Sequence, residues 1–353
     1  MTQAKSWFLR SFGEDLQAGP LELEAPSIDE ALVQVEACGM CHTDLGFASG
    51  SVKPKHDLPL VLGHEVVGTV LEAGGDFADL VGQRVIVPAV LPCGECALCA
   101  AGRGNACTRQ QMPGNDIHGG FSTHMLVRAA PLVPIVGAPE GLDTRALSVV
   151  ADAVSTAYQA ALRANLEEGD AAIVIGAGGV GGYLAQIARA LNARVIACDI
   201  DDARLAGLSQ FGAEATINVR DRGARDVRKE VRGILKDWDM PSLRWKIFEC
   251  SGSTPGQELA YTLIGRAATL AVVGYTFEKI PLRLSNLMAF DATVVGSWGC
   301  PPEAYAPVLD MIYSGAVVLE PFIEYAPMNT INQQLQAMAA HTLTRRMVLD
   351  PTL

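Results

Sequence analysis

The spacing of hydrophobic positions changes near residue 150, which predicts two regions of different architecture. Before that point, short runs such as Ala31–Ala37 and Val66–Leu71 alternate apolar with polar side chains, and Gly or Pro residues separate them. Alternation with a period of two is typical of half-buried strands, so this region is predicted to be β-rich. After Val149, strand-like runs alternate with helical patterns, which predicts a parallel sheet with helices on both faces.

The strongest local pattern in the second region is AAIVIGAGGVGG. A buried strand over Ala171–Ile175 is followed by Gly176, Gly178 and Gly181, and a helical pattern begins around Tyr183. In this G-x-G-x-x-G spacing, bare backbone allows close approach of a pyrophosphate to the N-terminus of a helix. The stretch is therefore interpreted as a phosphate-binding turn.

An acidic residue follows at the distance that this interpretation requires. The next predicted strand, Arg194–Cys198, ends at Asp199, where a carboxylate can bind both ribose hydroxyls of an adenosine. Asp201 and Asp202 add negative charge that repels a 2′-phosphate. The predicted cofactor is therefore NAD rather than NADP. The alternative to dinucleotide binding is that this stretch is a βαβ unit that binds no nucleotide.

The rest of the second half contains several more predicted elements. Residues Asp221–Asp239 read as a charged helix with a solvated face. After Cys300, the pattern predicts a helix near Tyr305–Tyr313, a strand near Val317–Tyr325 and a tail that ends in Arg345–Leu349.

Composition limits the classes of partner. The chain has 353 residues, enough for about two domains, and a net charge of −12, which disfavours nonspecific binding to nucleic acid or to an anionic membrane. No apolar run is long enough to span a membrane, and the N-terminal residues lack the pattern of a signal peptide. A cytoplasmic protein is expected, in which nine cysteines favour metal binding over disulfides.

Four cysteines form a compact motif, C-x2-C-x2-C-x7-C, at Cys93, Cys96, Cys99 and Cys107. Four thiolates at short spacing predict a closed tetrahedral zinc site that braces a loop. An iron–sulfur cluster is the competing interpretation. A zinc module that reads nucleic acid is disfavoured, because no basic helix lies beside the motif.

Two other stretches contain the residue types of a catalytic metal site. They are Cys41-His42-Thr43-Asp44 and Gly63-His64-Glu65-Val66-Val67-Gly68. Either could also be structural, because cysteine is often a buried apolar residue and a lone histidine is often part of a core.

Together, GHEVVG, the four-cysteine motif and GAGGVG resemble the zinc-dependent medium-chain alcohol dehydrogenases, in the order and approximate spacing of that family. The resemblance implies an α/β protein with a GroES-like β-rich catalytic domain over 1–153, including a structural zinc lobe over 91–110. It further implies a Rossmann NAD-binding domain over 154–299, and a segment over 300–353 that returns to the catalytic domain.

The same resemblance assigns roles to individual residues. Cys41 and His64 match ligands of a catalytic zinc, and Glu65 matches an acid that can approach the metal. Thr43 matches the hydroxyl that receives the proton of the alcohol, and Asp44 matches an acid that orients the histidine. The positions that match cofactor contacts or complete the nucleotide site are His42, Thr156, Gly176, Gly178, Gly179, Val180, Gly181, Asp199, Arg204 and Arg346. Two zinc ions and NAD are the implied cofactors.

The chain departs from the family pattern at two positions. Asp152 stands where many members have a cysteine ligand, and a carboxylate in place of a thiolate should leave zinc a stronger Lewis acid. Some bacterial secondary-alcohol dehydrogenases also have an acid there. Gly46 stands where many members have a histidine of the proton relay, so the proton must leave by another route, through ribose and water or through another residue.

The expected reaction is hydride transfer between NAD and a secondary alcohol or its ketone. Three runs, Trp245–Glu249, Arg283–Asp291 and Gly296–Cys300, are similar to 6-hydroxycyclohex-1-ene-1-carbonyl-CoA dehydrogenases, which implies a ring alcohol carried on a CoA thioester. A general secondary-alcohol or polyol dehydrogenase is the alternative enzyme, and a non-catalytic NAD-binding sensor or structural protein is the alternative from another class. The expected assembly is a homo-oligomer, a dimer or a tetramer.

Overall fold

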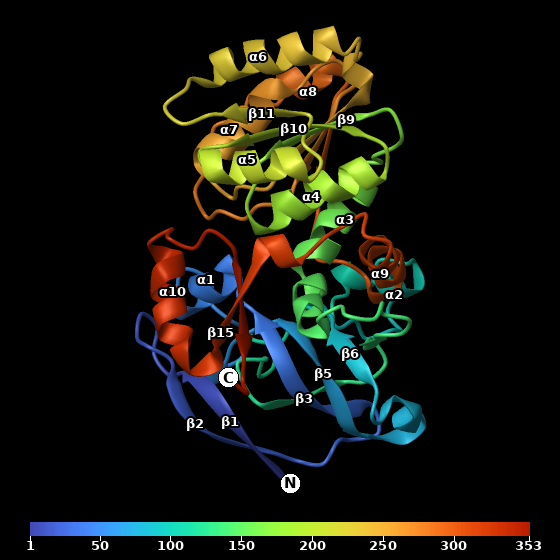
Figure 1. Ribbon diagram of the computed structural model, residues 1–353, viewed down its shortest axis with the longest axis vertical. Helices are drawn as coiled ribbons and strands as arrows, with labels where there is room; N and C mark the ends of the chain where they lie inside the picture. Colours follow the sequence, from blue (N-terminus) through green and yellow to red (C-terminus); the bar gives the residue numbers. More distant parts are fainter. The chain divides into compact units, whose positions relative to one another are not determined.

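The computed structural model describes residues 1–353, and the chain folds into two compact units (Figure 1). Unit 1 comprises Met1–Ser155, Gly299–Leu309 and Leu319–Leu353, and unit 2 comprises Thr156–Trp298 and Asp310–Val318. Asp310–Val318 lies within the C-terminal segment expected to return to the first domain, yet it belongs to unit 2. One reason is that the Gln186 side chain bonds both backbone groups of Val318, at 2.8 Å and 3.2 Å.

Unit 1 contains two sheets. The smaller sheet has the order β2 (Gln17–Leu23), β1 (Thr2–Leu9), β4 (Leu60–Val61). The larger has the order β15 (Ile323–Pro327), β16 (Arg346–Asp350), β3 (Glu30–Gly39), β5 (Glu65–Ala73), β6 (Arg84–Val87), β8 (Val133–Pro134), and β7 (His124–Arg128) also pairs with β3. The C-terminal strand β16 thus lies next to β3, with Val348 opposite Gly39.

Alternation along β3 explains how this strand serves two packing surfaces. Ala31, Val33 and Val35 join the main core of unit 1, whereas Leu32 faces a small cluster with Ala4 and Leu23. Successive side chains of a strand point to opposite faces, so the sequence pattern determines which residues enter which cluster.

Unit 2 contains one parallel sheet of six strands. Its order is β11 (Ala215–Asn218), β10 (Arg194–Asp199), β9 (Ala171–Ile175), β12 (Trp245–Glu249), β13 (Thr269–Val272), β14 (Thr293–Gly296). Numbered within the unit, this is 3-2-1-4-5-6, the order of the Rossmann fold. The prediction of an α/β protein with a β-rich part and a Rossmann part is confirmed.

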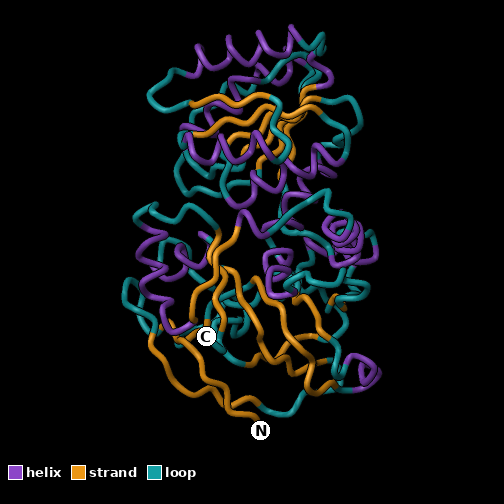
Figure 2. The backbone as a smooth tube through the Cα atoms, viewed as in Figure 1, coloured by secondary structure: helices purple, strands orange, loops and turns teal.

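Ten α-helices complete the two units. They are α1 (His42–Ser49), α2 (Ala97–Ala100), α3 (Ala153–Arg163), α4 (Gly179–Ala190), α5 (Asp202–Gln210), α6 (Ala224–Asp237), α7 (Thr254–Leu263), α8 (Ser285–Phe290), α9 (Tyr305–Tyr313) and α10 (Ile331–Ala339). In unit 2, helices lie on both faces of the sheet, with α4 and α5 on one face and α6 on the other (Figures 1 and 2).

Most predicted elements of the second half are present. The charged helix is α6, which buries Val227, Val231 and Leu235 against the sheet. The predicted strand near Val317–Tyr325 is wrong in its first half, because Glu320–Phe322 forms a 3₁₀ turn and β15 begins only at Ile323. Pro321 has no N–H for a strand ladder, which accounts for the later start.

No helix in the chain combines the length and the apolar character needed to cross a bilayer.

Candidate metal centre and dinucleotide site

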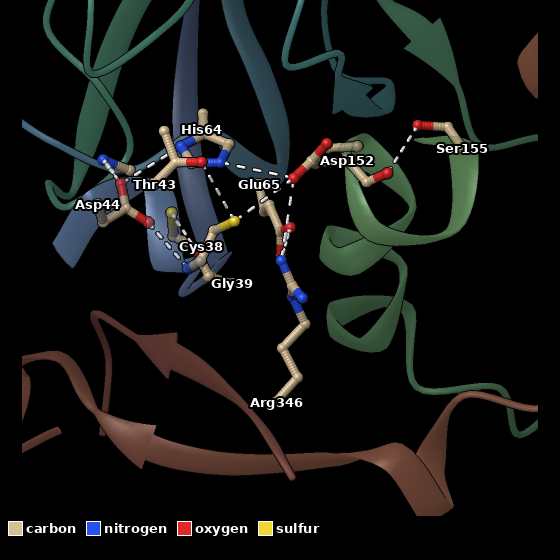
Figure 3. Close-up of polar contacts among 12 residues, drawn as sticks. Cys38, Gly39, Thr43, Asp44, His64, Glu65, Asp152, Ser155 and Arg346 are labelled. Carbon is tan, nitrogen blue, oxygen red and sulfur yellow. Dashed lines mark hydrogen bonds and ion pairs between the residues drawn. The ribbon is translucent and has the colours of Figure 1, made fainter. Parts of the chain in front are cut away.

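Four metal-binding side chains from three parts of unit 1 converge at one place. Cys41 precedes α1, His64 and Glu65 lie at the start of β5, and Asp152 lies between a 3₁₀ helix, η3 (Thr144–Ala151), and α3. Their ligand atoms all lie within 4.8 Å of one another. Figure 3 shows His64, Glu65 and Asp152 pointing toward one another. His64 and Glu65 are fully buried, whereas Cys41 and Asp152 are partly exposed, so the cluster has a solvent-facing side.

The spacing of three of these side chains matches a tetrahedral zinc site. Asp152 Oδ2 lies 3.7 Å from Cys41 Sγ and 3.7 Å from His64 Nε2. Zinc–ligand bonds of the usual length at tetrahedral angles place ligand atoms about 3.4 to 3.6 Å apart. A cysteine, a histidine and a carboxylate with one solvent-facing side are suited to a metal ion with an exchangeable position.

Asp44, in the first turn of α1, bonds backbone and side-chain groups on both sides of this cluster. It is fully buried, and its two carboxylate oxygens accept hydrogen bonds from the backbone N–H groups of Cys41 at 2.9 Å and Gly63 at 3.1 Å. Its Oδ1 also lies 3.3 Å from His64 Nδ1. With Nδ1 directed at Asp44, Nε2 is the nitrogen that faces Cys41 and Asp152, as expected of a metal-binding histidine with a carboxylate partner.

The same contacts shift the pKa of His64. Burial by itself lowers this pKa. The charge of Asp44 and the contact with Asp152 raise it by more than burial lowers it, so the pKa of His64 lies well above 6.5. Only neutral imidazole binds a metal ion, so metal binding here must displace a proton over a wider pH range than at an ordinary histidine.

Glu65 is paired with Arg346, the first residue of β16. The Arg346 Nε donates to Glu65 Oε2 at 2.8 Å, a second bond joins Arg346 Nη2 to Glu65 Oε1, and Arg346 Nη2 lies 3.9 Å from Asp152 Oδ2 (Figure 3). Burial raises the pKa of Glu65 to about 7, although Arg346 opposes this shift. Gly39 makes room for the pair, because a Cβ atom there would lie 2.2 Å from Glu65 Oε2.

The other two residues predicted around this cluster lie in α1. Thr43 Oγ1 is 3.6 Å from Cys41 Sγ and partly exposed, so its hydroxyl lies beside the metal-binding group. His42 is exposed, and its ring stacks on His341 with the ring centres 6.5 Å apart.

The four cysteines of the C-x2-C-x2-C-x7-C motif form a second cluster. Their sulfur atoms are separated by 4.0 Å for Cys93 and Cys99, 3.5 Å for Cys96 and Cys99, and 3.7 Å for Cys96 and Cys107. Thiolates in a tetrahedral zinc site lie about 3.8 Å apart, whereas a disulfide needs about 2.05 Å. A hydrogen bond to the backbone at Glu95 helps to lower the pKa of Cys93 to about 6, which favours the thiolate.

In unit 2, the glycine turn and the predicted acid meet as expected of a dinucleotide site. Asp199 ends β10, and its Oδ2 accepts a hydrogen bond from Ala177 N, within the turn, at 2.6 Å. Gly176 has a φ of +92°, and a Cβ atom at Gly181 would lie 1.8 Å from Gly176 O. Both positions therefore require glycine.

The remaining predicted cofactor residues of unit 2 lie in nearby helices. Gly179 and Val180 are in the first turn of α4, and Thr156 is in α3. Arg204 is in the first turn of α5, and a Cβ atom at Gly178 would lie 3.9 Å from Arg204 Nη1. Arg204 is thus close to the glycine turn.

Two residues of the metal-centre surroundings have no sequence signal. Tyr305 and Ser155 are buried and bond the backbone on either side of Asp152. They are 150 positions apart, and neither belongs to a motif, so only the folded chain reveals them.

Comparison with known families supports this arrangement. Residues 27–137 match the alcohol dehydrogenase GroES-like domain, and residues 179–314 match the zinc-binding dehydrogenase domain.

Individual proteins match over most of their length. An alcohol dehydrogenase of Geobacillus stearothermophilus is 31% identical over 93% of this chain and 94% of its own. L-galactonate-5-dehydrogenase of Escherichia coli is 28% identical over 85% of this chain and 84% of its own. The crystal structure of galactitol-1-phosphate dehydrogenase from Escherichia coli superposes with a TM-score of 0.85 at 25% identity, covering 98% of this chain and 100% of the other.

Proposed function

Because this chain belongs to the zinc-dependent medium-chain alcohol dehydrogenase family and is an oxidoreductase of that type, we propose that it transfers hydride between a secondary alcohol and NAD. The observation that carries the proposal is the convergence of Cys41, His64 and Asp152 at separations that suit a tetrahedral metal ion. The alternative of a non-catalytic sensor offers no reason for this donor set with one solvent-facing side.

Cys41, His64 and Asp152 hold the catalytic zinc in this proposal, and Glu65 is the acid that can approach it. When bound, zinc lowers the pKa of an alcohol hydroxyl and NAD accepts the hydride. Asp152 contributes a hard oxygen ligand with the same charge as a thiolate, which makes the metal a stronger Lewis acid. Asp44 fixes the orientation of the His64 ring.

Thr43 takes the proton of the alcohol. Its hydroxyl lies beside Cys41 and is partly exposed, so it can both accept and pass on a proton. Gly46 carries no side chain that could continue the path, so the proton would leave through the cofactor ribose and water, or through another residue.

The four-cysteine lobe holds a second, structural zinc. Its four thiol groups lie close enough to bind one ion and leave no position open for a substrate. Two zinc ions per chain follow from the two donor sets.

NAD occupies the glycine turn of unit 2, with Asp199 as the residue that selects it. Gly176, Gly178 and Gly181 leave backbone room for the pyrophosphate at the start of α4, where Gly179 and Val180 lie. Thr156 and Arg204 complete the cofactor contacts in unit 2. In unit 1, His42 and Arg346 are the proposed pyrophosphate contacts.

For the substrate, we propose 6-hydroxycyclohex-1-ene-1-carbonyl-CoA, oxidised to the 6-oxo product in the anaerobic breakdown of benzoyl-CoA. Support comes from the three runs that resemble dehydrogenases of this compound and from the preference of an aspartate-containing site for secondary alcohols. Gly46 also leaves more space than the histidine of many relatives.

A general secondary-alcohol or polyol dehydrogenase is the second candidate. It is favoured by two relatives whose names specify sugar-derived substrates, an L-galactonate dehydrogenase and a galactitol-1-phosphate dehydrogenase. Both named substrates carry secondary hydroxyl groups, so their oxidation is the same type of reaction as that of the ring alcohol, although neither substrate is a CoA thioester.

A comparison of substrates separates the two candidates. NADH formation is measured with the CoA thioester, the free acid, cyclohexanol, 2-butanol, L-galactonate and galactitol 1-phosphate. We expect kcat/KM for the thioester to exceed that for the simple alcohols by at least tenfold, because remote CoA contacts help to hold the reacting carbon. An inert thioester, or equal turnover of cyclohexanol, contradicts the CoA assignment, and turnover of the sugar substrates supports the second candidate.

We also propose a cytoplasmic homo-oligomer, a dimer or a tetramer. Strand β14 ends the sheet of unit 2, and the nearby apolar side chains Tyr275, Val294 and Trp298 are 68%, 41% and 54% exposed. An edge strand with exposed apolar neighbours is a template for pairing with a second copy.

A further inference from the structure

The backbone at Asp152 is not held by regular secondary structure. Asp152 lies between the last residue of η3 and the first residue of α3, with φ −136° and ψ −67°. These angles are outside the helical region, so the helical hydrogen-bond pattern is interrupted at this residue. Other groups must therefore fix the direction in which its carboxylate points.

Tyr305 bonds the residue before Asp152. Its side chain is 1% exposed, and its phenolic O–H donates to Ala151 O at 2.6 Å. Burial raises the pKa of Tyr305 well above 10, so the phenol stays protonated and remains a donor. Ala151 O also accepts a hydrogen bond from Ala89 N at 3.1 Å, which ties the same carbonyl to the segment after β6.

Ser155 links the other side of Asp152 to the same tyrosine. Its hydroxyl lies 3.2 Å from Asp152 O (Figure 3). It also lies 3.3 Å from the Tyr305 hydroxyl oxygen, so its one proton is shared between these two acceptors. Ser155 is fully buried. The carbonyls of Ala151 and Asp152 are therefore both tied to a Tyr305–Ser155 pair, and neither residue of the pair belongs to the metal-binding cluster.

We propose that Tyr305, through Ser155, is a positioning residue for the catalytic metal site. By fixing the two peptide groups that flank the Asp152 side chain, it holds Oδ2 at the distance from Cys41 and His64 that a metal ion requires. The inference rests on the proposed function, in which Asp152 is a zinc ligand. Tyr305 does not itself contact the metal, the alcohol or the cofactor in this proposal.

The test is Tyr305→Phe, which keeps the ring in its packing but removes the hydrogen bond to Ala151. The zinc affinity of each site is measured by chelator competition, and the catalytic zinc is also exchanged for cobalt(II) to record its absorption spectrum. We expect a loss of affinity of about tenfold at the catalytic site, as for other residues that orient metal ligands, and an altered cobalt spectrum. Affinity at the four-cysteine lobe should not change.

Two further variants make the outcome decisive. Ser155→Ala should weaken the catalytic site less than Tyr305→Phe does, and it decides the matter if the tyrosine variant does not fold. Tyr183→Phe, which alters an equally buried tyrosine of unit 2, should leave both sites unchanged. An unchanged catalytic-site affinity and cobalt spectrum in Tyr305→Phe, or an equal loss in Tyr183→Phe, overturns the inference.

Asp152→Ala separates this inference from the proposed function. If it loses the catalytic zinc while Tyr305→Phe binds zinc normally, only the positioning role is wrong. If Asp152→Ala retains both zinc ions, the proposed ligand set itself is wrong.

Discussion

At the scale of single residues, the metal centre depends on contacts between side chains far apart in the sequence. Cys41 and Asp152 are 111 positions apart, and Glu65 and Arg346 are 281 positions apart. Arg346 is ion-paired with the buried Glu65 and also lies 3.9 Å from Asp152. The Asp152 carboxylate therefore lies between Arg346 and the other two proposed ligands, Cys41 and His64. Each of these residues therefore affects the charge that a bound metal ion experiences.

We predict that Asp152→Ala lacks the catalytic zinc and has less than about 1% of wild-type activity, because one of three protein ligands is gone. Metal analysis should show one zinc per chain, retained by the four cysteines, which share no ligand with the catalytic site. Asp170→Ala removes a buried, ion-paired carboxylate of unit 2 and serves as the control with two zinc ions. An active Asp152→Ala protein with both zinc ions contradicts the prediction.

A second prediction concerns the proton at His64. Consider protein with zinc bound to the four cysteines but none at the catalytic site. The pKa of His64 there lies above 6.5, so part of the population is still protonated at pH 7.5. Zinc must displace that proton when it binds. Asp44→Asn removes the charge that most raises this pKa, so fewer protons should be released per zinc bound. Calorimetric titration with zinc in buffers of different ionisation enthalpy measures the release, and equal values for the two proteins would disprove this account.

At the scale of elements, the turn between β9 and α4 and the end of β10 together form the proposed dinucleotide site. The bond from Ala177 N to Asp199 fixes the acid beside the glycines, and Asp201 caps α5 by accepting from Ala203 N and Arg204 N. This arrangement gathers the negative charge of Asp199 and Asp201 beside the glycine turn, while Arg204 is the cation in the first turn of α5.

We therefore predict that wild-type enzyme prefers NAD to NADP, and that Asp199→Gly narrows the ratio of the two kcat/KM values by at least tenfold. Part of the change should come from weaker use of NAD, because the variant also loses the bond to Ala177. Asp237→Ala, at an exposed residue at the end of α6, is the control and should retain the preference. Equal kcat/KM for NAD and NADP in the wild type would refute the role of Asp199.

At the scale of the whole molecule, each unit supplies one part of the proposed reaction. Unit 1 contains both metal-binding clusters, and unit 2 contains the dinucleotide turn. The net charge of −12 means that an anionic substrate such as a CoA thioester needs local cations to bind. Arg283 and the basic residues of α6 are the candidates within unit 2, and their substitution should raise KM for the thioester more than for cyclohexanol.

The assembly prediction also belongs to this scale. Val294→Lys places a charge on the exposed edge strand β14 and should shift the protein from oligomer to monomer in sedimentation experiments. Thr216→Lys makes the same change on β11, the opposite edge of the sheet, and should not alter the assembly. A wild-type monomer, or an oligomer unaffected by Val294→Lys, would contradict the role of this edge.

Local sequence patterns by themselves determined much of the architecture. The glycine turn and the strand Ala171–Ile175 were predictable because a buried strand, a tight turn and a helix start each leave a signal within about ten residues. The four-cysteine lobe was predictable for the same reason, since its donors lie within one loop. The start of β15 was not, because a 3₁₀ turn competes with the strand there.

Only the tertiary structure decided how the metal centre is built around Asp152. Asp152 could be named from resemblance, but its distance from Cys41 and His64 depends on η3, α1 and β5 packing together. Arg346 approaches Glu65 because β16 pairs with β3, and Tyr305 approaches Ala151 from a segment that begins near residue 299. Contacts across 100 to 300 residues leave no periodic signal in the chain, because packing rather than local conformation creates them.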